Sequence, residues 1–241
     1  MTADYREIYR AHAAEYHRLV SAEDADGALR RAIAGVAPLA GRTAVEVGVG
    51  TGRVTELLLG AGVAKLVGVD VSAAMLEVAR RSLGRLAAPP GRALLLCAGE
   101  AERLPVADGF ADLAVAGWVF GHATHWFPDS WKAHVDAALG ECARATRKGA
   151  FHIVIETLGT GAESPAPPNA GLAAYYAHLE GVHGFRRVEL RTDYAFASPE
   201  IAAETCRLFF GDAFADEILR RRWSRVPECT GLWWRERPET P

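Results

Sequence analysis

The chain has 241 residues, a formal net charge of −3 and four cysteines without a Cys-x-x-Cys pair. This length suits one α/β domain with a sizeable core and is short for two, and mild acidity with no long basic run argues against binding to nucleic acid. The scattered cysteines indicate neither a disulfide framework nor a zinc site. No apolar run reaches membrane-spanning length and no signal peptide is evident, so we expect a cytoplasmic protein with no membrane partner.

Two helices are predicted before the first strand. Apolar and aromatic residues recur at three- and four-residue steps over residues 4–20, which is the period of an amphipathic helix. These positions are Tyr5, Ile8, Tyr9, His12, Tyr16 and Leu19. Residues 27–36 form a second predicted helix that ends near Pro38. Most of the side chains on the first helix are expected to pack against a neighbouring element.

The most informative pattern runs from residue 43 to residue 75. An apolar run ends in three alternate glycines, Gly48, Gly50 and Gly52, a helical stretch follows, and a second apolar run ends at Asp70. This order predicts a strand–turn–helix–strand unit. Glycines permit positive φ and close approach of a ligand to the backbone, and the helix that opens near Gly52 offers free N–H groups. An acid at the end of the second strand can bind both ribose hydroxyls, so the unit predicts an adenosine ligand.

Two residues in this unit argue against a dinucleotide. The dinucleotide fingerprint Gly-x-Gly-x-x-Gly/Ala carries a pyrophosphate, but here the third glycine comes one residue early and Arg53 follows it. The Glu46 carboxylate would repel a pyrophosphate and attract a cationic amino group. The pattern Glu-x-Gly-x-Gly-x-Gly followed by Asp70 resembles the cofactor site of class I S-adenosylmethionine-dependent methyltransferases. The resemblance implies that Glu46 faces the methionine moiety, that Asp70 holds the ribose and that Val71 also contacts the cofactor.

A second segment is similar to the small-molecule, methyltransferase type 11-like group of that family. Residues 97–115 contain Gly-Glu-Ala-x-x-Leu-Pro followed by Phe-Ala-Asp. The resemblance implies that Glu100 lies near the adenine amino group and that the backbone of Ala101 meets the ring edge. Met75 is interpreted equally well as a core residue or as an adenine contact. The resemblance covers residues 40–157 and implies an α/β fold: a Rossmann-like doubly wound sheet of about seven strands, mostly parallel with the last antiparallel, and helices on both faces.

The remaining elements complete one predicted class I methyltransferase domain over residues 1–241. In the family, N-terminal helices (here residues 1–40) often cover the cofactor, and the helical insertion at 198–225 is a candidate substrate lid. Residues 89–91, Pro-Pro-Gly, are predicted to interrupt secondary structure, and a loop is predicted at 162–169. Strands are predicted at 92–97, 111–117, 150–155, 185–196 and 226–236, and helices at 72–86, 130–147, 171–182, 199–214 and 216–222.

The segment after the strand at 111–117 is unusually rich in aromatic residues. Ligands of open parallel sheets lie beyond the carboxyl ends of the strands, so this segment is expected to face the transferable methyl group. Aromatic faces can hold a cationic or planar substrate, and His122 can accept a proton from a hydroxyl or amine. We predict His122 as the catalytic base and Trp118 and His125 as substrate-binding residues. The alternative is that these rings fill a gap or lie in solvent. Without a third ligand beside the two histidines, we expect no metal.

Tyr16 and Glu156 complete the predicted acceptor site. Glu156 ends the strand at 150–155, where it can meet an amine or hydroxyl or pair with an arginine. The predicted function is transfer of a methyl group from S-adenosyl-L-methionine to an oxygen or nitrogen of a small-molecule substrate. The alternatives are a non-catalytic S-adenosylmethionine-binding module, a non-methylating reaction assisted by the sulfonium and, least favoured by Glu46 and Arg53, an NAD-dependent oxidoreductase.

Overall fold

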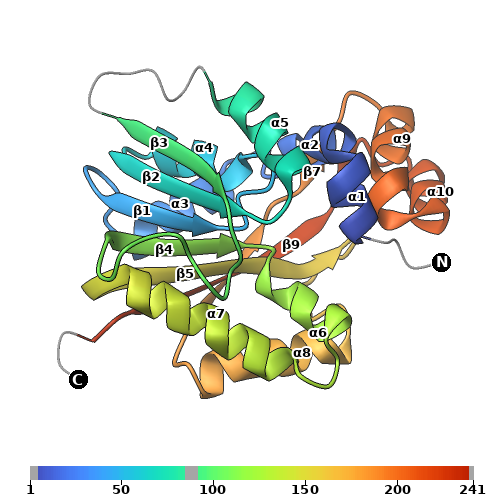
Figure 1. Ribbon diagram of the computed structural model, residues 1–241. Coiled ribbons are helices and arrows are strands. Elements are labelled where there is room, and N and C mark those ends of the chain that lie inside the picture. Colours follow the sequence, from blue (N-terminus) through green and yellow to red (C-terminus); the bar gives the residue numbers. More distant parts are fainter. Residues whose placement is uncertain (1–4, 85–91, 239–241) are drawn as a thin grey trace.

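Seven strands form one sheet in the computed structural model, which describes residues 5–84 and 92–238 (Figure 1). Their order is β3-β2-β1-β4-β5-β9-β6. The pairs among β1 to β5 are parallel, and β9 is antiparallel to both of its neighbours. The predicted sheet with an antiparallel last strand is therefore confirmed. The strands are β1 (Thr43–Val47), β2 (Lys65–Asp70), β3 (Ala93–Ala98), β4 (Ala111–Gly117), β5 (Thr146–Thr160), β6 (Arg186–Arg191) and β9 (Glu228–Glu236).

Helices cover both faces of this sheet. β1 and β4 are buried along nearly their whole length, which is typical of parallel strands between two helical layers. One buried cluster joins α7 and α8 to one face, and a second joins α3 and α4 to the other. α5 packs beside β2 and β3. The bounds are α3 (Ala28–Val36), α4 (Arg53–Gly60), α5 (Ala73–Leu83), α7 (Trp131–Ala145) and α8 (Ala170–Gly181).

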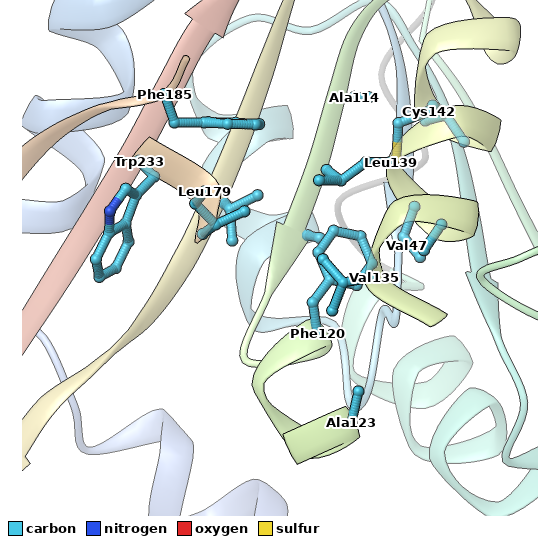
Figure 2. Close-up of a cluster of buried hydrophobic side chains, with 14 of the residues drawn as sticks. Val47, Ala114, Phe120, Ala123, Val135, Leu139, Cys142, Leu179, Phe185 and Trp233 are labelled. Carbon is cyan, nitrogen blue, oxygen red and sulfur yellow. The ribbon is translucent and has the colours of Figure 1, made fainter. Parts of the chain in front are cut away.

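The first cluster forms the larger part of the core. Figure 2 shows Val135 and Leu139 of α7 beside Phe120, with Leu179 of α8 and Trp233 of β9 nearer the far edge of the sheet. All of these side chains are at most 4% exposed. Burying a large apolar side chain contributes about 1.5–3 kcal/mol, so this layer fixes α7 and the segment before it against the strands.

Four helices gather at the carboxyl ends of the parallel strands (Figure 1). The single helix predicted at the N-terminus is two helices, because the backbone of His12 leaves the helical region at φ −125° and ψ 31°. A break of one residue barely disturbs the hydrophobic period, which is why the sequence pattern does not reveal it. α9 packs on both of these N-terminal helices. The four are α1 (Tyr5–Ala11), α2 (Ala13–Ser21), α9 (Pro199–Phe210) and α10 (Asp212–Arg221).

Two predicted strands differ from those in the structure. β5 begins at Thr146, directly after α7, and is longer than the predicted 150–155. The strand predicted at 185–196 is β6 followed by the separate β7 (Tyr194–Ala195), which pairs with β8 (Arg225–Val226). The chain leaves the sheet there because the carbonyls of Thr192 and Asp193 accept hydrogen bonds from the loop after α2, at Asp24 and Ala25. The break predicted at 89–91 lies outside the described residues.

Glycines shape the turn between β1 and α4. Gly48 has φ 68°, and a Cβ there would lie 2.2 Å from Cγ2 of Val119. Gly52 has φ 97°, and its Cβ would lie 2.6 Å from Cδ1 of Leu83 in α5. Both positions therefore need glycine for the left-handed backbone and for close packing. Among the helices of the described residues, none is both long and apolar enough to cross a membrane.

We predict that Gly52→Ala lowers the free energy of unfolding by about 2 kcal/mol or more. A Cβ at positive φ costs about 1–2 kcal/mol, and overpacking against Leu83 costs about 1–3 kcal/mol. Urea unfolding measures the change. The control is Gly140→Ala in α7, where a Cβ meets nothing within 4 Å and where alanine should raise stability by about 0.5–1 kcal/mol. Equal stability of Gly52→Ala and the wild type would contradict the packing role.

Candidate cofactor and acceptor site

A cavity of about 960 Å³ lies at the carboxyl ends of β1, β2 and β4. Strand order reverses between β1 and β4, which is the point where open α/β sheets bind ligands. The volume lies near the upper end of the range of about 300–1,000 Å³ for ligand pockets. Walls are contributed by the glycine turn, the start of α5, residues 99–102, the segment after β4, α7 and the two N-terminal helices.

Asp70 lies at the floor of the cavity, at the end of β2. Its Oδ2 accepts a hydrogen bond from the Gly50 N–H at 2.7 Å, and its Oδ1 accepts one from the Ser72 N–H at 2.8 Å. Burial raises the pKa of Asp70, and these two hydrogen bonds oppose the rise. The neighbouring Val71 also lines the cavity and is 78% exposed. An apolar side chain and a carboxylate thus lie side by side at the end of β2.

The three glycines have different surroundings. Gly48 and Gly50 line the cavity, whereas Gly52 does not and packs on α5. Gly50 has φ 56°, and a Cβ there would meet no atom within 4 Å. The backbone is therefore open to a ligand at Gly50. Met75, although only 2% exposed, also lines the cavity.

Glu100 and Ala101 form another part of the wall. Glu100 is exposed, and it forms an isolated β-bridge with Arg103 that shapes the turn after β3. The structure therefore brings the second predicted segment to the same cavity as the glycine turn.

Glu46 lies beneath the turn and does not line the cavity. Its Oε2 accepts a hydrogen bond from the Thr55 hydroxyl of α4 at 2.6 Å. Burial raises the pKa of Glu46 to about 8, so the isolated protein holds this carboxyl largely protonated at neutral pH. In this arrangement Glu46 fastens β1 to α4.

His122 and Tyr9 stand at the other end of the cavity. His122 lies in the short helix η1 (Phe120–His122), and α6 (Ala123–Trp126) follows. The Tyr9 hydroxyl lies 3.0 Å from Nε2 of His122, and the imidazole stacks on Trp126 with ring centroids 4.6 Å apart. Burial and, to a lesser extent, nearby His125 together lower the pKa of His122 to about 4. His122 is therefore neutral at pH 7.

Two other predicted residues line the cavity and sit on its rim. Tyr16 contacts the edge of Tyr9, with centroids 5.3 Å apart. Trp118 has a left-handed backbone, φ 55°, and carries the Arg53 guanidinium 4.5 Å above its ring. Arg53 in turn forms a 2.5 Å ion pair with Glu23. This chain of contacts ties the loop after α2 to the glycine turn and to the rim after β4.

Two predicted acceptor residues do not line the cavity. His125 is exposed and is not among the residues that line the cavity. Glu156 is 4% exposed, and its Oε1 accepts hydrogen bonds from the Gly121 N–H at 2.9 Å and the Tyr175 hydroxyl at 3.2 Å. Burial raises the pKa of Glu156 to about 7. Glu156 thus holds the loop that carries His122.

Three lining residues are not among the predicted site residues, although two of them belong to the aromatic-rich segment after β4. Trp126, Phe127 and His134 reach the cavity from α6, the following loop and α7. His134 stacks on Phe127 at 3.9 Å between centroids and bonds Glu102 at 2.6 Å. Their positions depend on how α7 docks on the sheet, which no local pattern encodes. Tyr9 and Tyr16 are both candidate lining residues from the family resemblance, in which the N-terminal helices cover the cofactor, and both line the cavity.

Comparisons with known proteins agree with this geometry. Residues 45–154 match a family described as a methyltransferase domain. No protein with a curated description matches this sequence. The matched methyltransferase domain spans the glycine turn, Asp70 and β4, and with the fold it implies S-adenosylmethionine-dependent methyl transfer with S-adenosylmethionine as the cofactor.

Solved structures share the fold at low sequence identity. A S-adenosylmethionine-dependent methyltransferase from Aquifex aeolicus is 15% identical, with 88% of this chain and 93% of that chain covered and a TM-score of 0.53. A proposed methyltransferase from Haloferax volcanii, solved in complex with the Trm112 methyltransferase activator, is 19% identical, with 95% of each chain covered and a TM-score of 0.59. The [4+2]-cyclase SpnF is 17% identical, with coverage of 87% and 80% and a TM-score of 0.56.

We predict that Glu156→Gln flattens the fall in stability with rising pH. The pKa of Glu156 is raised from 4.5 to about 7, so its stabilising contribution is complete below about pH 4.5 and is lost as pH rises through 7. One pKa unit corresponds to about 1.36 kcal/mol, which makes the loss roughly 3 kcal/mol by pH 8. Glutamine retains an oxygen for both donors and does not ionise.

Urea unfolding at pH 5 and pH 8 measures this difference. The wild type should lose more unfolding free energy between the two values than Glu156→Gln does. The exposed Glu189→Gln is the matched control and should keep the wild-type slope. An unchanged slope in Glu156→Gln would show that Glu156 ionises in the folded protein as freely as it does in water.

Proposed function

We propose that this enzyme transfers the methyl group of S-adenosylmethionine to an oxygen or nitrogen of a small, partly apolar molecule. The observation that carries the proposal is one continuous cavity with the glycine turn and Asp70 at one end and a group of aromatic rings at the other. Its two ends differ in chemistry, as donor and acceptor sites must. The net charge of −3 also disfavours a nucleic-acid substrate.

The donor end suits S-adenosylmethionine. Asp70 offers a carboxylate for the ribose, Val71 and Met75 offer apolar surface for adenine, and Glu100 with the backbone of Ala101 meets the polar edge of the ring. The open backbone at Gly50, where a Cβ would find only empty space, admits the amino-acid part of the ligand. Glu46 acts from beneath the turn, by holding β1 against α4 through Thr55.

The acceptor end is a cage of aromatic rings. Planar acceptors can stack against such rings, and pairs of rings gain about 0.5–1.5 kcal/mol beyond the area that they bury. Tyr5 lies 5.5 Å from His122 and 4.9 Å from Phe209 between ring centroids. The aromatic cage, as we define it, consists of five rings that line the cavity and two that pack behind them. The lining rings are Tyr9, Tyr16, Trp118, His122 and Trp126, and the two behind them are Tyr5 and Phe209. Trp118 lines the cavity, which supports its proposed contact with the substrate. Glu156 acts indirectly, because it holds the loop of His122 through the Gly121 N–H, and His125 does not line the cavity.

The N-terminal helices within residues 1–40 cover the cavity, and the insertion at 198–225 serves as its lid. Support comes from Tyr9 and Tyr16, which line the cavity from α1 and α2. Phe209 of α9 contacts Tyr16 at 5.5 Å between centroids. We infer that an acceptor enters the aromatic cage when this contact opens, which requires α9 to move away from α2.

Methyl transfer depends mainly on the alignment of the acceptor atom with the methyl–sulfur bond. S-adenosylmethionine supplies a methyl group on a positively charged sulfur, and displacement requires the nucleophile to lie in line with that bond. The aromatic cage orients the acceptor and excludes water. Nε2 of neutral His122 lies 3.0 Å from the Tyr9 hydroxyl. In the tautomer with its proton on Nδ1, this nitrogen takes the proton that the acceptor loses. A pKa of about 4 makes His122 a weak base, which suits a nucleophile that loses its proton late in the reaction.

The experiment follows a labelled methyl group from S-adenosylmethionine into a panel of phenols, aromatic amines and carboxylates, with tRNA and protein fractions beside them. We expect transfer to a small aromatic acceptor. Label only in tRNA or protein would contradict the proposed acceptor class. Tight cofactor binding without any turnover would instead favour a non-catalytic module.

We predict that His122→Ala lowers kcat roughly tenfold to hundredfold with the acceptor so found, below the 10²–10⁴-fold range of strong general bases. Affinity for S-adenosylhomocysteine should be unchanged. Because the pKa of His122 is lowered to about 4, kcat of the wild type should stay level from pH 6 to 8 and fall only as pH approaches 4. Tyr9→Phe is the matched variant, since it removes the hydroxyl that binds Nε2. An unchanged kcat in His122→Ala at saturating acceptor would remove the role of base.

A further inference from the structure

Asp136, His178 and His183 form a cluster outside the cavity, which we call the His–Asp cluster. Asp136 lies on α7, His178 lies on α8, and His183 follows α8. Both histidine Nε2 atoms lie 2.7 Å from the same atom, Oδ1 of Asp136. The three atoms are within 4.8 Å of one another. None of the three residues lines the cavity, so methyl transfer does not account for them.

The backbone fixes the two imidazoles before any ligand arrives. The N–H groups of Val182 and His183 both donate to the carbonyl of His178, at 3.0 and 3.3 Å. Gly184, with φ 68°, lets the chain reverse after His183. The His183 carbonyl accepts a hydrogen bond from Nη1 of Arg235 in β9 at 2.8 Å. The two rings therefore converge because the turn after α8 is locked to the sheet.

The donor set suits a transition-metal ion. Two imidazoles and one carboxylate are ligands that Zn²⁺ accepts, with a further position left for water. Both Nε2 atoms lie against the same carboxylate oxygen, Oδ1 of Asp136. A carboxylate that only accepted hydrogen bonds from two donors could use one oxygen for each. Zn–N and Zn–O distances of about 2.0–2.1 Å put tetrahedral ligand atoms roughly 3.3 Å apart. Asp136 is 46% exposed, so its side chain has room to move by the half ångström or so that an ion requires.

We propose that the His–Asp cluster binds one divalent transition-metal ion such as Zn²⁺. The bound ion would hold α7 against α8. The sequence predicts no metal because Asp136 and His178 lie 42 residues apart and only the docking of the two helices joins them. The brace supports the cavity indirectly, since α7 supplies Val135 to its wall and α8 supplies Tyr175, which holds Glu156. The site stands apart from the acceptor proposal.

Calorimetric titration of ZnCl₂ into the tag-free, metal-stripped full chain tests the site. We expect one ion per chain. Asp136→Asn and His183→Gln should each weaken binding roughly tenfold or more. Loss of a metal ligand should cost at least as much as loss of a residue that hydrogen-bonds to a ligand, which typically costs about 10–100-fold. The matched control, His12→Gln, removes one histidine elsewhere and should bind as the wild type does. Thermal unfolding should show zinc raising Tm of the wild type and of His12→Gln, because an ion that binds only the folded chain stabilises it.

Each other result would overturn the site. Failure of the wild type to bind zinc would leave the cluster as a hydrogen-bonded brace between two helices. Stoichiometric binding that both substitutions leave unchanged would place the ion elsewhere. Circular dichroism confirms that both variants are folded. The two substituted residues are the more exposed members of the cluster, with side chains 46% and 18% exposed against 10% for His178, so their replacement should not disturb the core.

Discussion

The carboxylate of Asp70 joins the ends of the first two strands. Its two oxygens accept hydrogen bonds from the N–H groups of Gly50 and Ser72, while the Val69 carbonyl accepts those of Gly48 and Val49. A carboxylate so buried is costly unless its oxygens are satisfied, and here the backbone of the ligand-binding turn satisfies them. The same group thus fixes the shape of the turn and presents charge at the cavity floor. The rest of the site is built outward from this point.

The acceptor end depends on contacts that cross the sheet. Glu156 holds the loop of His122 from β5, and Arg53 joins Glu23, in the loop after α2, to Trp118 after β4. These buried charged groups give up hydration to fix loops that have few apolar contacts of their own. Because a partner lost from a buried pair leaves an uncompensated charge, the loops are expected to be well defined before the ligands bind. Alignment of two reactants requires such order.

The sequence predicts those parts of the molecule whose cause is local. The strand–turn–helix–strand unit over residues 43–75 follows from the pattern of one short segment, and the structure has β1, α4 and β2 there. The mostly parallel sheet with an antiparallel last strand follows from the family resemblance, and the fold confirms it. Side chains whose surroundings come from distant elements are harder to predict. Glu156 is predicted just after the end of a strand, but β5 continues to Thr160, and the Tyr175 hydroxyl of α8 binds the buried Glu156 carboxylate. The approach of His178 to Asp136 depends in the same way on how two helices pack.

The most direct test of the account is calorimetric titration of S-adenosylhomocysteine into the wild type and Asp70→Asn. We predict that the wild type binds it and that the substitution weakens binding at least roughly tenfold, because a hydrogen bond to a charged group contributes about 1.5–3 kcal/mol. The exposed Asp108→Asn, whose native side chain is 83% exposed, should bind as the wild type does. Absence of binding by the folded wild type, or binding of NADH in its place, would contradict the assignment of the cavity.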